Sequence, residues 1–133
     1  MQNPGPQASP DAPYESLEEV LRTRLVVIQR LGRLAEYKED PGGRHVIRVS
    51  QYARALGLRA GLAPAEAEML MHAAAMHDVG KIGIPEHILT KPGRLDEDEW
   101  EVMKTHAALG AEIIGSDDSP VLRMARDVAL THH

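Results

Sequence analysis

An imidazole next to a carboxylate is the feature of this sequence with the most direct chemical meaning. His77 and Asp78 follow the small residues Ala74 and Ala75, which would let a helix pack closely, and Lys81 adds a cation three residues later. Both members of the pair can ligate a transition metal if the backbone leaves a helix there. A lone His-Asp pair at a helix end is more often without function, so this pair needs support from the rest of the chain.

Four further histidines stand where they could complete a metal site. His45 precedes one amphipathic stretch, His106 lies within another, and His132 and His133 end the sequence. Together with Asp78 and its neighbouring imidazole, these residues are spread over four predicted helices, which suits a metal site between facing helices of a bundle. Such a ligand set is compatible with Fe, Mn, Zn or Ni.

The two remaining histidines are expected to be structural or surface residues. His72 is five residues before His77 and therefore points to another face of the predicted helix. His87 lies in a short helical piece within a loop rich in glycine and proline.

The elements that would position these residues are all helices. Hydrophobic spacing predicts helices over residues 17–38, 44–58, 64–77, 97–114 and 120–130, with a short piece at 86–89. Ser16 with Glu19 and Asp96 with Glu99 have capping-box spacing, and Pro64 suits a first helical turn. We therefore predict an all-α fold, a bundle of about five main helices with the metal site between them.

Composition narrows the fold and the function classes further. The chain has no Phe and one Trp, so the core is expected to consist of Leu, Val, Ile, Ala and Met. In the fourth main helix, the residues expected on the packed side are Trp100, Met103, Ala107, Gly110 and Ile114. The absence of Cys excludes disulfides and thiolate zinc sites and fits a reducing, cytoplasmic location.

Charge and hydropathy argue against a nucleic-acid-binding protein and against a membrane-spanning one. The formal net charge of −5 argues against binding to a nucleic-acid polymer. No apolar run is long enough to span a bilayer. Residues 1–14 are polar and rich in Pro and Gly, so we expect a disordered lead without a signal peptide.

Taken with their surroundings, these residues resemble a known family. The motif that carries the resemblance is His45, His77-Asp78, His106 and His132-His133, together with Gly80-Lys81-Ile82-Gly83-Ile84-Pro85, Ile88-Leu89, Lys91-Pro92-Gly93 and Leu95. This pattern resembles the HD-GYP branch of the HD phosphohydrolases over roughly residues 35–133. The resemblance implies a catalytic core over residues 41–133, with residues 15–40 forming a linker or first helix.

The resemblance also implies an activity and roles for the site residues. The expected reaction is hydrolysis of cyclic di-GMP to the linear dinucleotide or GMP by a metal-activated water. The implied metal ligands are His45, His77, Asp78, His106, His132 and His133. Asp78 would bridge two divalent metals, preferably Fe or Mn, with Zn or Ni as alternatives. One metal would be bound by His45, His77 and either His132 or His133. The other metal would be bound by His106 and the remaining member of that terminal pair. Lys81 would contact the phosphate or organise the nucleophile.

The sequence departs from the family pattern in two places. Trinuclear members carry a glutamate four residues before the first histidine, where this chain has Pro41; Glu39 and Asp40 are near but off register. Two metals are therefore expected rather than three. The Gly-Tyr-Pro motif that follows the His-His pair in the family lies beyond His133, so we expect a C-terminally incomplete core with weakened metal affinity and low turnover.

Two alternatives and several partners remain open at this point. The chain could instead be an HD phosphohydrolase acting on another nucleotide, or a truncated or degenerate domain that binds metal, nucleotide or protein without turnover. The expected partners are a cyclic dinucleotide substrate, an upstream sensor or receiver domain or a diguanylate cyclase, and a second copy of the chain through the first helix.

Overall fold

The computed structural model describes residues 16–133, and this part of the chain is helical without a strand. In chain order its elements are α1 (Leu17–Ala35), α2 (Arg44–Arg59), α3 (Pro64–Ala74), the 3₁₀ segment η1 (Val79–Gly83), α4 (Glu86–Leu89), α5 (Glu97–Lys104), α6 (His106–Ile114) and α7 (Pro120–Thr131). The predicted all-α fold is confirmed. The lead expected over residues 1–14 lies outside the described residues. None of the described helices is long and apolar enough to cross a membrane.

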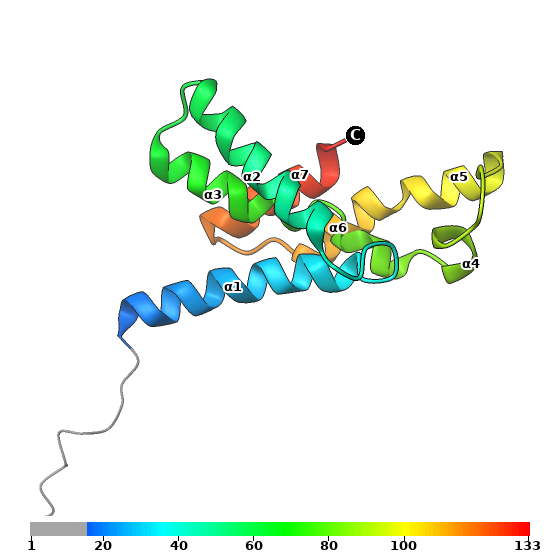
Figure 1. Ribbon diagram of the computed structural model, residues 1–133, viewed down its shortest axis with the longest axis horizontal. Helices are drawn as coiled ribbons and strands as arrows, with labels where there is room; N and C mark the ends of the chain where they lie inside the picture. Colours follow the sequence, from blue (N-terminus) through cyan, green and yellow to red (C-terminus); the bar gives the residue numbers. More distant parts are fainter. Residues whose placement is uncertain (1–15) are drawn as a thin grey trace, which may run out of the picture.

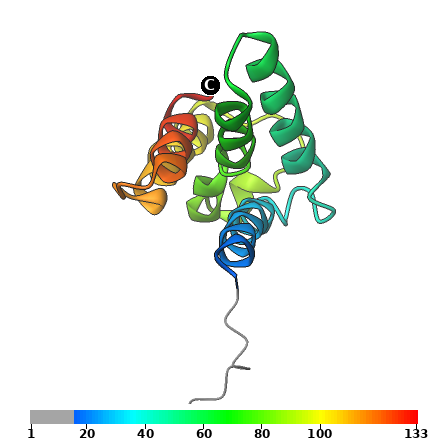
Figure 2. The same ribbon diagram turned by 90° about the vertical axis from the view of Figure 1, so that its left-hand side faces the viewer.

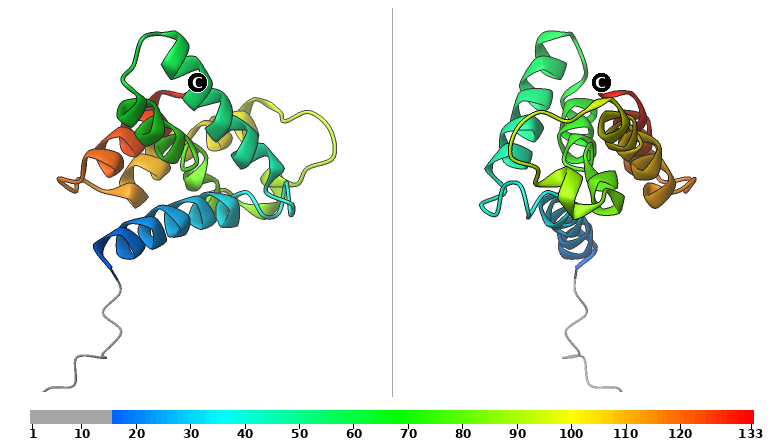
Figure 3. Two further views of the ribbon diagram at one scale, coloured as in Figure 1. Left: turned by 60° about the vertical axis from the view of Figure 1, so that its left-hand side comes forward. Right: turned by 90° about the vertical axis from the view of Figure 1, so that its right-hand side faces the viewer.

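The helices form a bundle around the turn that follows α3. Figure 2 shows α3 between α2 and α7, with α1 beneath them, and α3 contacts both of its neighbours. Helix α6 packs against α7 and η1, while the C-terminal part of α1 lies against η1 (Figure 1). The connection between α4 and α5 reaches out from this bundle (Figure 3). Residues 75–80 of the turn after α3 are therefore buried within the bundle.

Helix α1 begins as predicted and ends earlier. The capping box is present, since the Glu19 N–H donates to Ser16 Oγ at 3.2 Å and the Ser16 N–H donates to Glu19 Oε2 at 2.9 Å. The helix ends at Ala35 rather than at residue 38. A Cβ added to Gly32 would lie 1.9 Å from the Ala75 carbonyl oxygen, so only glycine lets α1 approach the turn after α3 this closely.

The helix predicted over residues 97–114 is interrupted, so the prediction of one continuous helix was wrong. The N–H and Oγ1 of Thr105 both donate to the Val102 carbonyl, at 3.1 and 2.6 Å, which tightens the chain into a turn. Helix α5 ends at Lys104 and α6 starts at His106. Trp100, expected on the packed side, is 51% exposed. The helix predicted over residues 64–77 also ends early, at Ala74.

Small side chains dominate the core, and leucine is missing from it. Among the described residues, the buried hydrophobic side chains are alanines with a few Val, Met and Ile, whereas every leucine remains at least partly exposed. Ala67, Ala73, Ala125 and Ala129 are fully buried. The expectation of a core that includes Leu was wrong, because helices without aromatic residues approach closely enough for alanine to fill the space.

Candidate metal centre

Asp78 occupies the middle of the site. It lies in the turn after α3, directly before η1, and is 6% exposed. Its Oδ1 is 3.2 Å from His106 Nε2 and 3.1 Å from His132 Nε2. Its Oδ2 is 3.2 Å from His77 Nε2 and 2.9 Å from Lys81 Nζ. One carboxylate therefore turns its two oxygens to two different sets of imidazoles.

The first set of possible ligands comes from three segments. It comprises Glu36 at the end of α1, His45 in the first turn of α2, and His77 with Asp78 after α3; one ligand atom from each lies within 4.8 Å of the others. The rings of the two histidines meet edge to face, with centroids 5.4 Å apart. Asp40 fixes the first turn of α2, because its Oδ2 accepts the His45 N–H at 2.7 Å.

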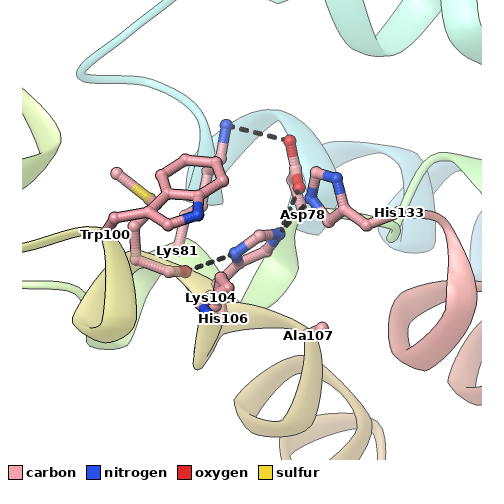
Figure 4. A pocket seen from close by; sticks show the side chains of 8 residues that line it. Asp78, Lys81, Trp100, Lys104, His106, Ala107 and His133 are labelled. Atoms are coloured by element: carbon pink, nitrogen blue, oxygen red, sulfur yellow. Dashed lines mark hydrogen bonds and ion pairs between the residues drawn. The ribbon is translucent and has the colours of Figure 1, made fainter. Parts of the chain in front are cut away.

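The second set lies on the other side of Asp78. It combines that carboxylate with His106 at the start of α6 and His132 and His133 directly after α7, again within 4.8 Å of one another. His106 Nε2 is 3.2 Å from His132 Nε2 and 3.0 Å from His133 Nε2. Figure 4 shows His106 and His133 turned toward Asp78.

Three of these imidazoles are oriented by the backbone in the same way. Each Nδ1 donates to the carbonyl three residues earlier: His77 to Ala74 at 2.9 Å, His106 to Met103 at 2.6 Å and His132 to Ala129 at 2.9 Å. A carbonyl only accepts, so Nδ1 carries the proton, and in the neutral ring Nε2 presents a lone pair.

Converging lone pairs repel one another unless a cation or a proton lies between them. Metal-ligating histidines typically donate their second N–H to a carbonyl or carboxylate, which is the arrangement found here. The donor set, the shared carboxylate and the fixed tautomers therefore fit divalent metal ions, and this cluster could bind them.

The electrostatics of the site are dominated by burial and by Asp78. Burial opposes ionisation of Asp78, yet bonds from His77 and Lys81 hold the pKa of its carboxyl well below the usual range. Burial likewise opposes the Lys81 cation, but its contacts with Asp78 and Glu39 raise its pKa. For Glu36 burial prevails and raises the pKa to about 7. The site thus holds an ionised Asp78 beside a cationic Lys81.

All six residues predicted as metal ligands come together in the structure. His132 and His133 both have ligand atoms close to that of His106, and the His132 ring also lies 5.2 Å from the His77 ring, centroid to centroid. The fourth position of the first set is taken by Glu36, which the sequence reasoning missed. A signal was available: Glu36 follows Gly32 by four residues and Ala35 by one, and both of these small residues lie on the buried face of α1.

The two histidines set aside as structural or surface residues lie away from the site. His72 is buried, with Gln29 Nε2 3.4 Å from its Nδ1 and Glu68 Oε1 3.7 Å from its Nε2. Burial lowers its pKa. His87 is exposed on α4. Both therefore agree with the reading made from the sequence.

A cavity of about 450 Å³ opens beside the second set of ligands. Its polar wall consists of Asp78, Lys81, His106 and His133, and its other wall consists of Trp100, Met103, Lys104 and Ala107. Figure 4 shows the indole of Trp100 across the space from the imidazoles. The half-exposed tryptophan is therefore part of this cavity rather than of the core.

Comparison with known proteins shows that the chain belongs to the HD domain family. Residues 42–133 match the family model described as HD domain. The chain is 39% identical over 111 residues to 3′3′-cGAMP-specific phosphodiesterase 2 of Vibrio cholerae, covering 84% of this chain and 21% of the relative. It is 38% identical over 107 residues to a cyclic di-GMP phosphodiesterase of Thermotoga maritima, covering 80% and 29%.

A third relative combines the same activity with a regulatory role. The chain is 35% identical over 118 residues to the cyclic di-GMP phosphodiesterase response regulator RpfG of Xanthomonas campestris, covering 89% of this chain and 31% of the relative. The chain thus spans less than a third of the length of each of these relatives.

Proposed function

Because the chain belongs to the HD domain family, we propose that its His and Asp cluster is the metal centre of an HD-GYP-type phosphodiesterase. The proposed substrate is a cyclic dinucleotide, cyclic di-GMP in the first place, opened to the linear dinucleotide or cut to GMP. The names of the relatives support this substrate class, since they act on cyclic di-GMP or on 3′3′-cGAMP.

The observation that carries the proposal is the position of Asp78 between two sets of imidazoles. Each carboxylate oxygen is 3.1 to 3.2 Å from at least one Nε2. That arrangement supports two metal positions bridged by Asp78. Besides Asp78, the first position would have His45 and His77 as ligands, and the second would have His106, His132 and His133. Mixed imidazole and carboxylate ligation favours Fe or Mn, with Zn or Ni as alternatives.

The side chains of the site have defined parts in phosphodiester hydrolysis. When bound, a pair of divalent ions lowers the pKa of water and neutralises phosphate oxygens. Asp78 stays ionised and fixes the two ligand sets relative to each other. Lys81 stays protonated, and its Nζ lies in the polar wall of the cavity, where it can donate to a phosphate oxygen.

The opposite wall of the cavity suits a nucleobase. The indole of Trp100 is half exposed and faces the metal-ligating residues across the space (Figure 4). An exposed aromatic face near a phosphate-binding group can stack on a purine. We assign Trp100 and Met103 to base contact, and Lys104 at the edge to electrostatic attraction of the dinucleotide.

Helix α1 is the proposed connection to other parts of the signalling system. Leu17, Leu21, Leu31 and Leu34 are 46 to 74% exposed on it. These side chains would pack against a second copy of the chain or against an upstream sensor or receiver domain, and the response-regulator relative supports the latter. A diguanylate cyclase is a further proposed partner, and the cytoplasm is the proposed location because the substrate class is a bacterial messenger.

The proposal is tested first by metal content. Protein purified without chelator, together with Asp78→Ala and the matched control Asp118→Ala in an exposed turn, is measured by elemental analysis. We expect about two transition-metal ions in the parent and the control, and few in Asp78→Ala with the helical circular dichroism retained. Metal-free parent protein would rule out the proposed chemistry.

The second test is hydrolysis of the proposed substrate. Metal-loaded protein is incubated with cyclic di-GMP, 3′3′-cGAMP and a linear nucleotide diester, and the products are separated by chromatography. Cleavage of a cyclic dinucleotide supports the proposal. Turnover of only the linear diester indicates a phosphohydrolase with another substrate, and metal binding without any turnover indicates a binding domain.

A further inference from the structure

Glu36 is the most deeply buried acidic residue in the part of the chain that the structure describes. Its side chain is 3% exposed, and it lies at the C-terminal end of α1, before the residues that match the HD domain. Its Oε1 has no hydrogen-bond partner. Burying a carboxylate without a partner is costly, so the fold must gain something at this position.

The imidazoles nearest to Glu36 lie beyond hydrogen-bond distance. Oε1 is 3.8 Å from His77 Nε2, and Oε2 is 4.0 Å from His45 Nε2, both too far for a hydrogen bond. The proton that His77 Nε2 can carry is directed at the nearer Asp78 Oδ2, at 3.2 Å. The Glu36 oxygens therefore face two imidazole nitrogens without a hydrogen bond to either.

These separations suit a shared metal ion. Ligand oxygens and nitrogens bind first-row divalent metals at roughly 2.0 to 2.2 Å, so two ligands of one ion lie up to about 4.2 Å apart. The observed separations of 3.8 and 4.0 Å fall within that limit.

The backbone holds Glu36 in this position. Its carbonyl accepts the N–H groups of Glu39 and Asp40 at 3.0 and 2.8 Å, and its own N–H donates to the Gly32 carbonyl at 3.4 Å. Gly32 in turn lies against the Ala75 carbonyl, two residues before His77. The end of α1 is thus attached to the same turn that carries the His-Asp pair.

We propose that Glu36 is a ligand of the first metal and supplies the carboxylate that Pro41 cannot supply from the position before His45. This assignment rests on the metal centre of the proposed function. It makes α1 part of the metal site, although α1 lies outside the matched HD domain. The first metal would then have two imidazole and two carboxylate ligands, a harder set than the three imidazoles of the second.

The test compares Glu36→Gln with Glu18→Gln, an exposed acid in the first turn of the same helix. Chelator-stripped proteins are titrated with Mn²⁺, and free Mn²⁺ is followed by electron paramagnetic resonance. We expect the parent and Glu18→Gln to bind about two ions, and Glu36→Gln to lose about one or to bind it at least tenfold more weakly.

Thermal unfolding provides a readout that a purely structural role would not give. Without metal, Glu36→Gln should unfold at the same temperature as the parent or higher, because it removes a buried charge. With Mn²⁺ the order should reverse. Equal Mn²⁺ stoichiometry and affinity in parent and Glu36→Gln would overturn this assignment while leaving the proposed function intact. A parent that binds no Mn²⁺, Fe²⁺ or Zn²⁺ would overturn both.

Gly32→Ala tests the same assignment with the carboxylate retained. The new Cβ would meet the Ala75 carbonyl oxygen at 1.9 Å, so α1 must shift away from the turn. We expect the first metal to bind at least tenfold more weakly while the second is retained. Parent-like binding of both ions in Gly32→Ala would count against the attachment of α1 to the site.

Discussion

Replacing Gly80 with alanine should disturb both the packing around the site and its metal binding. Gly80 lies in η1, where its Cα faces the backbone at the start of α6. An added Cβ would be 1.9 Å from the His106 carbonyl oxygen and 2.5 Å from the Gly110 nitrogen. Both neighbours are backbone atoms that cannot rotate away, so η1 and α6 must move apart.

The size of the effect follows from these distances. Real Cβ contacts do not come below 3.0 Å, so the His106 carbonyl must retreat by about 1 Å. Overpacking of this kind costs roughly 1 to 3 kcal/mol, and the reduced entropy of the unfolded chain offsets up to about 1 kcal/mol. We expect Gly80→Ala to lower the free energy of unfolding by about 2 kcal/mol, or roughly 8 °C in Tm.

The same shift should weaken the metal centre. Asp78 is two residues before Gly80, and its Oδ1 is 3.2 Å from His106 Nε2. A displacement of about 1 Å exceeds the tolerance of about 0.2 Å for metal–ligand distances. We therefore expect Gly80→Ala to lose the second metal in elemental analysis even where the protein is still folded.

Gly83→Ala is the matched control at the other end of η1. Its added Cβ would be 3.0 Å from Leu109 Cδ1, a flexible side-chain end that can rotate. Urea denaturation should show a change within about 1 kcal/mol, with parent metal content. The reasoning would be refuted if Gly80→Ala matched this control in both stability and metal content.

Three further predictions concern individual side chains. Lys81→Ala should lower kcat for a cyclic dinucleotide by roughly 100-fold, because a charge that stabilises the phosphate is lost, and leave the metal content of the protein unchanged; a loss of metal would assign Lys81 to structure instead. Trp100→Ala should raise KM roughly tenfold through lost stacking, and Trp100→Phe should bring KM back close to the parent value. A parent-like KM in Trp100→Ala would show that Trp100 does not contact the base. In chelator-treated protein, burial raises the Glu36 pKa from 4.5 to about 7, so its contribution to stability is fully present below about pH 4.5 and is lost as the pH rises through about 7. Urea titrations at several pH values should therefore show the free energy of unfolding of Glu36→Gln rising relative to that of the parent between these two pH values. A difference in unfolding free energy that does not change with pH would contradict this sign.

Local signals account for most of the helices. Capping boxes at Ser16 and Asp96 are present, and Pro64 opens its helix, because these features involve residues three or four apart. The break at Thr105 was missed for a related reason. Its backbone stays in the helical region, and only the bonds of its N–H and hydroxyl to Val102 tighten the turn, which hydrophobic spacing does not reveal.

The kinds of residue in the metal centre could be predicted, but their arrangement could not. The sequence pointed to six ligands because five histidines and an aspartate, spread over four predicted helices, match the HD-GYP pattern. Which of them share a metal position depends on how α6 and α7 pack against the turn after α3, and that packing brought His132 and His133 to the same side of Asp78. Spacing along the chain carries no information on that choice.

The sequence by itself determined that this protein is helical, and it pointed to a cluster of imidazoles and a carboxylate within the bundle. Only the tertiary structure decided that Glu36 joins them and that Trp100 lines a cavity instead of the core. The physical reason is the range of the forces involved. Helix formation and capping act within a few residues, whereas the burial of Glu36 and the exposure of Trp100 depend on which helices approach from elsewhere in the chain.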